Sequence, residues 1–315
     1  MKTARGFLIC GCLVSLIGGF GGSHRLLAAA SANSLRDNQE PQGAQAPAGQ
    51  ATIIDKTPAE LVRALPQLAG LEPAASQEIL PEILQKLGAN VEAYFRSVLS
   101  TCAQEETIQQ RLGTDDGVEE SVKQTFRYLV IAHPEKGPLQ LEEYRTDEKG
   151  LTAGASLLTG TVLTERFVYL PVYLHPQYQD DSDFSYMGQQ TVTGHKCYVV
   201  AFAQIPEAAH LRAQLNDGPV SLSVLLQGLV WADATSFQII RMYTQLLPYA
   251  SGSNVREFNT DVTYGEVRFP GVDVVLWLPR EVVVDIDWGS KNRRYRNYHH
   301  YSNYQLYASQ SKIIY

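Results

Sequence analysis

Hydrophobic residues between positions 57 and 99 recur every three or four residues, which is the spacing of helices with one buried face. The first helix begins at Thr57-Pro58-Ala59-Glu60, which combines a capping box with proline at the first helical position. We expect this helix to run to about Leu65.

Two more helices are expected before the pattern changes. One covers 79–87, where Pro81 marks a kink or a fresh start and Gly88 is the candidate C-cap. The other covers 90–99 and has Asn90 as its N-cap. The pattern therefore predicts three short helices on the N-terminal side of all other predicted elements.

Beyond residue 104 the hydrophobic period changes from 3.6 to 2, which is the period of β-strands. No helical crossovers of ten or more residues separate these strands, so an antiparallel meander is expected and parallel βαβ units are not. The candidate strands are 105–112, 120–132, 139–146, 184–189, 191–205, 221–232, 236–247, 258–269, 273–287 and 294–308.

The strand over 237–247 is unusual because neither of its faces is clearly polar. A sheet that is apolar on both sides must be covered on both sides or must line an apolar cavity, and the three helices can cover only one concave face. By contrast, 282–288 alternates apolar residues with acids, so solvent reaches that strand. The aromatic segment 157–178 contains Pro171 and Pro176 and is either a short helix or a loop across the sheet, a candidate lid.

The N-terminus is typical of an exported chain. Residues 1–30 contain a basic start, an apolar run over 7–20 and three alanines at 28–30, as signal peptides do. The residues around Cys12 weakly resemble a lipoprotein cleavage site, so cleavage, lipidation and a retained anchor stay open. Residues 31–56 have the composition of a disordered linker. The remainder divides into a helical segment, 57–102, and a β domain packed on it, 103–315.

Charge narrows the classes of partner. The 315-residue chain carries 26 Lys and Arg against 33 Asp and Glu, a formal charge of −7, and removal of 1–30 would bring it to −10. Such acidity argues against a nucleic-acid partner. The segment 291–301 interleaves cations with aromatic residues, as surfaces for single strands, anionic headgroups or sugars do. We interpret it as a structural terminal strand with a solvated basic turn.

Motifs for catalysis or cofactors are scarce. The chain lacks G-x-S-x-G, H-E-x-x-H, G-x-x-x-x-G-K-[ST] and G-x-G-x-x-G, so no catalytic residue, metal or cofactor is assigned. Asp180-Asp181-Ser182-Asp183 is a calcium loop or a solvated acidic loop, and Glu281, Asp285 and Asp287 are paired acids or the wet face of a strand. Outside the leader, Cys102 and Cys197 form either one disulfide or two separate buried thiols.

Three stretches in the predicted strands resemble those of a known family. The stretch Gly194 to Val200 is followed by Gly228 to Asp233, which is similar to the pattern G-x-V-W-I-D. After a turn, Phe237 to Arg241 contains the pattern I-x-R. This pattern resembles the central hairpins of lipoprotein-carrier-like half-barrels, which include the periplasmic outer-membrane lipoprotein carriers and receptors. The ends 276–282 and 298–307 are similar to those of other exported bacterial proteins of this layout. The resemblance implies an α+β fold in which about eleven antiparallel strands form a half-barrel, with short amphipathic helices on its concave side and an apolar cavity between them.

Three functions follow as hypotheses. The first is an exported, non-enzymatic protein of the periplasm or cell exterior that binds a lipid or a lipidated protein. The second is a structural or protein-interaction module with an envelope protein as partner and no small ligand. The third is a hydrolase whose acids or Ser-His pair converge only in the fold. For the first hypothesis, the candidate ligand-binding residues are Phe167, Tyr169, Tyr173, Trp231, Ile240, Met242 and Trp277.

Overall fold

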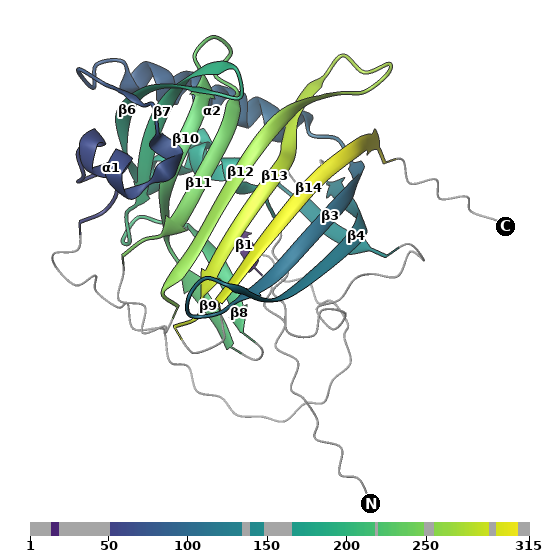
Figure 1. Cartoon of the computed structure of the whole chain (residues 1–315). Coiled ribbons are helices and arrows are strands. Elements are labelled where there is room, and N and C mark those ends of the chain that lie inside the picture. The colour runs from purple at the N-terminus through teal and green to yellow at the C-terminus, as the bar shows by residue number, and fades with distance from the viewer. Residues whose placement is uncertain are drawn as a thin grey trace, which may run out of the picture.

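The computed structural model describes residues 14–18, 51–133, 139–147, 166–217, 220–248, 255–289 and 294–307 (Figure 1). Its elements, in chain order, are β1 (Val14–Gly18), α1 (Pro58–Ala64), η1 (Pro66–Leu68), β2 (Glu72–Pro73), α2 (Leu80–Ser97), β3 (Thr101–Leu112), β4 (Val118–Ala132), β5 (Leu141–Thr146), η4 (Leu170–Leu174), η5 (Pro176–Asp181), β6 (Ser182–Val192), β7 (His195–Gln204), β8 (Leu211–Asp217), β9 (Val220–Val224), β10 (Leu226–Asp233), β11 (Ile239–Leu246), β12 (Glu257–Arg268), β13 (Val275–Asp287) and β14 (Arg294–Leu306). The elements labelled η are 3₁₀ helices.

Helix α1 forms as its sequence predicts. The Thr57 side chain accepts a hydrogen bond from the Glu60 N–H, and the Glu60 carboxylate accepts one from the Thr57 N–H at 2.7 Å, which completes the capping box. Pro58 occupies the first turn, where its missing N–H is not needed. Leu61 is the residue that this helix buries.

The second and third predicted helices are one helix, α2. It begins beside Pro81 and runs without a break through Gly88 and Asn90, so Gly88 is not a C-cap and Asn90 is not an N-cap. A β-carbon at Gly88 would lie 2.5 Å from the Gln179 side-chain nitrogen and 3.4 Å from the Leu174 carbonyl oxygen. The glycine therefore lets the helix lie close to the segment that crosses beside it, which is a tertiary requirement rather than a helix-ending signal.

The predicted α+β half-barrel is confirmed by the strand order. Eleven strands form one antiparallel sheet in the order β2-β6-β7-β10-β11-β12-β13-β14-β3-β4-β5. The last strand of the chain, β14, pairs with the first long strand, β3, so the two ends of the domain meet in the middle of the sheet (Figure 1). The sheet curves around α2, which lies on its concave side.

The strand predictions differ from the structure mainly around residue 220. The expected strand over 221–232 is two strands, β9 and β10, and β8 was not predicted although Leu211, Ala213 and Leu215 alternate with polar residues. Strands β1, β8 and β9 form a separate three-stranded sheet. Buried side chains of β8 belong to the same apolar cluster as α2, so this small sheet closes one end of the concave side.

Both faces of the sheet are covered between β6 and β11. On the concave side, Leu87, Val91 and Phe95 of α2 pack against the sheet. On the convex side, Leu61 of α1 and Leu68 of η1 join a second apolar cluster. Figure 1 shows α1 and α2 on opposite sides of the strands. The expectation that the N-terminal helices cover one face only is corrected, because they are split between the two faces.

Farther along the sheet the convex face is wet, as the alternation in 282–288 predicts. Asp285 of β13 pairs with Arg296 of β14 at 2.6 Å, and Arg241 of β11 pairs with Asp261 of β12. Asp287 lies 3.7 Å from Arg294. Of the carboxylates considered as paired acids, Asp285 and Asp287 are thus cross-strand partners of arginines, and Glu281 pairs with His300.

The described fold begins earlier than the predicted boundary at residue 57. Ile53 is 1% exposed and its N–H donates to the Gln227 side chain at 2.6 Å, so the end of the expected linker packs on the sheet. The remainder of that linker and the expected signal segment lie outside the described residues, except that β1 pairs with β8.

Gly228 provides a test of the central sheet. A β-carbon there would lie 2.0 Å from the Tyr243 carbonyl oxygen, a backbone atom that cannot move without disturbing β11. We expect Gly228→Ala to lower the free energy of unfolding by about 3 kcal/mol or more, measured by urea denaturation. The matched control is Gly113→Ala, whose β-carbon would meet only the carboxylate ends of Asp115 and Glu119. A similar loss in both variants would contradict this account.

Candidate functional site

The concave side of the half-barrel is filled by residues 167–178, which we call the plug. It contains η4 and the start of η5, and every residue from Phe167 to Leu174 is buried. The aromatic segment 157–178 was expected as a short helix or a loop; residues 157–165 lie outside the described residues, and the described part forms turns and 3₁₀ helices between α2 and the sheet. Pro171 and Pro176 each occupy the first turn of one of these 3₁₀ helices.

Aromatic contacts join the plug to both of its neighbours. The Tyr169 ring meets Phe95 of α2 edge to face, with 5.4 Å between ring centroids. The Tyr173 ring stacks on Phe202 of β7 at 6.0 Å. The plug thus packs into the main apolar core, between α2 and β7.

Hydrogen bonds to the plug come mainly from side chains. The Tyr264 hydroxyl donates to the Phe167 carbonyl at 3.0 Å, and the Tyr94 hydroxyl donates to that of Val168 at 3.2 Å. The Gln179 side-chain amide donates at 3.0 Å to the carbonyls of Leu84 and Leu174, which links α2 to the plug. Such single bonds can break one at a time, unlike the ladder that holds a strand.

Tyr173 carries a polar group that the closed core does not satisfy. Its hydroxyl is buried and has no hydrogen-bond partner among the described residues, and the side chain is 2% exposed. Burial raises the pKa of this hydroxyl. A buried hydroxyl without a partner destabilises the folded state by about 1–3 kcal/mol, so the packed plug is not the best environment for this residue.

The seven candidate ligand-binding residues do not share one surface. Phe167, Tyr169, Tyr173 and Met242 belong to the concave cluster, whereas Trp231 and Ile240 belong to the convex cluster and Trp277 is packed against both. Ile240 and Met242 were expected on one face because they are two residues apart. A register shift between β10 and β11, at Trp231/Ala232, adds one residue to the alternation and separates them.

Trp231 is held on the convex side by specific contacts. Its indole N–H donates to the Gln190 side-chain oxygen at 2.7 Å, and the Arg241 guanidinium lies 5.0 Å from its ring centroid. These contacts make Trp231 part of a filled core on that side, because its indole N–H is satisfied and its ring is 0% exposed.

The space between α2, the plug and the sheet is small. A gap of about 20 Å³ lies between α2, the plug and the sheet, where Tyr94, Pro171 and Trp277 are among its lining residues. This is about the space of one water molecule. The apolar cavity that the resemblance implies is therefore occupied by the chain's own plug.

Beneath Phe167 the concave face changes from apolar to ionic. Glu105 of β3 accepts two hydrogen bonds from the Arg145 guanidinium of β5, at 2.5 and 2.8 Å. The same carboxylate lies 2.8 Å from His299 Nδ1 and accepts a hydrogen bond from the Tyr301 hydroxyl at 2.8 Å. Glu105, His299 and Tyr301 are 0% exposed and Arg145 is 4% exposed. We call these four residues the ionic cluster.

The register of the sheet explains the ionic cluster. Tyr301 stands opposite Glu105 in the β14–β3 pair, and Tyr128 stands opposite Arg145 in the β4–β5 pair. The Arg145 guanidinium reaches Glu105 across the Tyr128 ring, whose centroid lies 5.5 Å away. The edge of the Phe167 ring covers His299, with centroids 5.1 Å apart. The plug thus seals a group of charges that is paired within itself.

Charge pairing in the cluster shifts its pKa values. Burial alone would raise the pKa of Glu105, but the adjacent Arg145 charge and the bonds from His299 and Arg145 lower it to about 2. Burial lowers the pKa of His299, and Glu105 only partly opposes that effect. The resting cluster therefore consists of a carboxylate, a guanidinium and a neutral imidazole.

Sequence reasoning did not find this cluster. In strand β3, the buried Glu105, Thr107 and Gln109 are all polar, and the apolar Ile108 between them is on the exposed face, so the sequence does not identify the buried face. The one usable signal was the prediction that His299 and His300 face opposite sides. The structure agrees, because the His299 side chain is 0% and the His300 side chain 52% exposed.

Cys102 and Cys197 are free and buried. Cys102 lies on β3 and Cys197 on β7, and β10 to β14 separate these strands in the sheet order, so the disulfide considered as one alternative is not formed. Burial raises the pKa of the Cys197 thiol to about 12. The structure contains the other alternative, two separate buried thiols.

The described residues contain neither a candidate metal site nor a candidate membrane-spanning helix. No group of three or more His, Cys, Asp or Glu side chains lies close enough to hold a metal ion in that part of the chain. No helix within the described ranges is long and apolar enough to cross a membrane.

Comparison with known proteins adds solved structures of similar layout. A domain described as an outer-membrane lipoprotein-sorting protein domain, from Vibrio parahaemolyticus, is 10% identical, with a TM-score of 0.37 over 73% of this chain and 94% of its own. A LolA-superfamily protein from Nitrosomonas europaea is 12% identical, with a TM-score of 0.37 over 77% of this chain and 98% of its own. A DUF1329-family protein from Desulfovibrio piger is 10% identical, with a TM-score of 0.33 over 73% and 94%. No protein-family model and no curated protein sequence matches the chain.

The fold is an antiparallel α+β half-barrel. This assignment rests on the strand order and on the position of α2 in the chain's own structure. The half-barrel predicted from the sequence is confirmed at the level of fold.

The ionic cluster makes stability depend on pH. Because the folded pKa values of His299 and Glu105 lie below 6.5 and 4.5, the unfolded chain binds more protons in acid. The free energy of unfolding should therefore fall as the pH falls, first below about 6.5 through His299 and then from 4.5 toward about 2 through Glu105.

His299→Gln should reduce this slope between pH 6.5 and 5, as measured by urea denaturation at a series of pH values, because glutamine can still donate to Glu105 but does not titrate. His300→Gln is the control, since His300 lies on the opposite face and is half-exposed. Equal slopes in the two variants would argue against the cluster as the source.

The thiol assignment has a direct test. We expect a cysteine-specific alkylating reagent to leave Cys102 and Cys197 unlabelled in the native protein and to label both after denaturation without reductant, because Cys197 is 0% and Cys102 7% exposed. Intact-mass spectrometry measures both states. A mass two hydrogens lighter, with no label after denaturation, would mean that the cysteines form a disulfide.

Proposed function

We propose that this chain is an exported, non-enzymatic protein of the cell envelope whose concave face binds the acyl chain of a lipid or of a lipidated protein. In this proposal the plug leaves the concave face when the ligand enters, so the structure corresponds to the closed form. The observation that carries the proposal is the plug itself, a buried apolar segment of 3₁₀ turns that occupies the place of an acyl ligand.

The plug has two physical properties that would let an acyl chain take its place. Its apolar side chains match the apolar concave surface, so an acyl chain could make similar contacts. Its attachment depends on a few side-chain hydrogen bonds, from Tyr264, Tyr94 and Gln179. The unpartnered Tyr173 hydroxyl would gain hydrogen bonds to water on release, which favours the open form.

The ionic cluster would give the opened surface a polar end. Movement of Phe167 would uncover His299 and, beside it, the paired Glu105 and Arg145. A surface with an apolar part and a charged part suits an amphiphile rather than a purely apolar molecule. The periplasmic or extracellular location belongs to this proposal and rests on the signal-peptide pattern of residues 1–30.

A second function is supported by the small size of the remaining gap. The gap between α2, the plug and the sheet is only about 20 Å³, which is consistent with a filled module whose surface recognises an envelope protein. In that case the plug never moves, and changes within it alter stability without altering ligand binding.

Two tyrosine-to-phenylalanine substitutions distinguish these functions. Tyr173→Phe removes a hydroxyl that has no partner among the described residues, so it should stabilise the closed form by about 1 kcal/mol and weaken acyl binding several-fold. Tyr264→Phe removes the bond to the Phe167 carbonyl, so it should destabilise the closed form and strengthen binding. The measurements are urea denaturation and titration with the fluorescent fatty acid cis-parinaric acid.

The opposite directions make the test specific, because both variants lose one oxygen atom. Tyr298→Phe is the control, since Tyr298 is 38% exposed. If cis-parinaric acid does not bind, or if it binds all variants equally while their stabilities differ, the plug does not exchange with ligand and the interaction-module function is favoured.

A further inference from the structure

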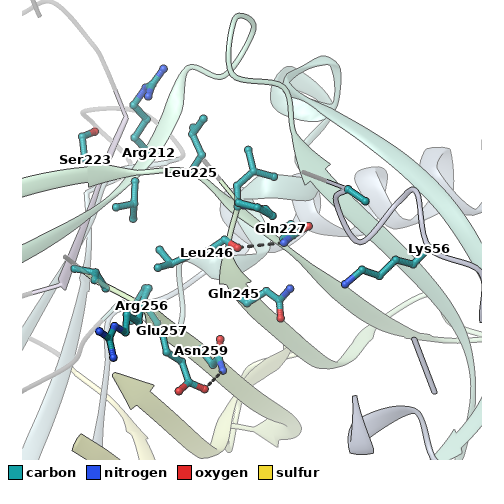
Figure 2. Close-up of a pocket in the computed structure, with 16 residues that line it drawn as sticks. Lys56, Arg212, Ser223, Leu225, Gln227, Gln245, Leu246, Arg256, Glu257 and Asn259 are labelled. Atoms are coloured by element: carbon teal, nitrogen blue, oxygen red, sulfur yellow. Dashed lines mark hydrogen bonds between the residues drawn. The ribbon is translucent and has the colours of Figure 1, made fainter. Parts of the chain in front are cut away.

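A pocket of about 410 Å³ lies at the rim of the half-barrel, away from the plug (Figure 2). It is formed where β9 leads into β10, where β11 ends and where β12 begins. None of its lining residues belongs to the plug or to the ionic cluster. Its volume lies within the range of small-molecule sites, so we call it the rim pocket.

The rim pocket has an excess of positive charge. Lys56 precedes α1, Arg212 lies on β8 and Arg256 directly precedes β12, so three separate segments each supply one cation. Glu257 is the one carboxylate among the lining residues. This excess is opposite in sign to the chain as a whole, which has 33 acidic and 26 basic residues. Long-range attraction of an anion to this rim would depend on these cations.

No salt bridge joins any of the three cations to another residue whose side chain the structure describes. Arg212 uses one nitrogen to donate to the Pro206 carbonyl at 3.3 Å, which leaves its other donors unused by that bond. A guanidinium has five N–H donors in a planar arrangement that suits carboxylate and phosphate oxygens.

Buried hydrogen bonds fix one wall of the pocket. The Gln227 side chain accepts the Ile53 N–H at 2.6 Å and donates to the Leu246 carbonyl at 3.1 Å. These bonds hold the segment before α1 against the sheet, three residues ahead of Lys56. Figure 2 shows the Lys56 side chain running toward Gln245, with Arg212 and Arg256 at the margins. The site is thus built partly from buried groups and not only from surface chains.

The rest of the pocket wall is part polar, with Ser223, Gln227, Gln245 and Asn259, and part apolar. The aliphatic and aromatic side chains that line it include Val224, Leu225, Leu247, Val255 and Phe258. Leu225, Leu247 and Phe258 are less than 8% exposed, so the wall is continuous with the core. A small inorganic anion would use the cations but not this wall.

We propose that the rim pocket binds an amphiphile with an anionic headgroup, which lies among Lys56, Arg212 and Arg256 while its chain lies along the apolar wall. This site does not require the plug to move, so it goes beyond the function proposed above.

Glu257 repels a bound anion least when its carboxyl group is neutral. Burial and the neighbouring Asp285 raise its pKa, and Asn259 holds its carboxylate at 2.5 Å.

Isothermal titration calorimetry of the purified full-length protein tests the proposal. The probes are decyl phosphate, inorganic phosphate and decanol, which separate the contributions of the headgroup and the chain. We expect decyl phosphate to bind at least about tenfold more tightly than either of the other two, because only it can use both the cations and the wall.

Charge substitutions locate the site. Lys56→Gln and Arg256→Gln, both at exposed positions, should each weaken decyl phosphate binding about three- to tenfold. Glu257→Gln should strengthen it, since a negative charge is removed while an acceptor for Asn259 is kept. Arg268→Gln is the matched control, because it lies at the other end of β12 and pairs with Glu266.

Several outcomes would overturn the proposal. Equal affinity for decyl phosphate and inorganic phosphate would mean a site for a free anion, and equal affinity for decyl phosphate and decanol would mean an apolar groove. Unchanged binding in both Lys56→Gln and Arg256→Gln would place the ligand elsewhere. Weaker binding in Tyr173→Phe but not in these two variants would place it beneath the plug, which separates this proposal from the preceding one.

Discussion

A sheet with apolar side chains on both faces has to be covered on both faces, and this requirement organises the molecule. In β7, the neighbours Val199 and Val200 point to opposite sides and are both 0% exposed. The convex side is covered by α1 and η1, and the concave side by α2, the plug and strands β8 and β9. Where β12 to β14 carry Asp285 and Arg296 instead, the convex face is left to solvent.

The two concave covers differ in kind. Helix α2 satisfies its own backbone, whereas the plug consists of 3₁₀ turns that borrow hydrogen bonds from Tyr94 and Tyr264 and leave the Tyr173 hydroxyl without a described partner. Next to the plug, the ionic cluster pairs its charges internally, so it tolerates burial whether or not a ligand is present. The concave side therefore combines the ionic cluster, whose charges are paired with one another, with the plug, an apolar segment held by packing and a few side-chain hydrogen bonds.

Short sequence patterns predicted the helices and strands that depend on interactions between residues close in the chain. The capping box at Thr57 begins α1, and the period of two identified the long strands of the half-barrel. The signals failed where a distant contact decided the outcome. Gly88 continues α2 because Leu174 passes close to it, and one extra residue in β11 moves Ile240 and Met242 to opposite faces. That shift also divided the candidate ligand-binding residues between two cores.

The sequence by itself determined the antiparallel α+β half-barrel, the two-sided burial of its central strands and the opposite directions of His299 and His300, because alternation and turn chemistry act between neighbours in the chain. Only the tertiary structure decided what fills the concave side and which charges meet. Glu105 and His299 are 194 residues apart in sequence, and the cations of the rim pocket come from three separate segments. Pairing of the last strand with the first long one brings such groups together, and no local pattern specifies that register.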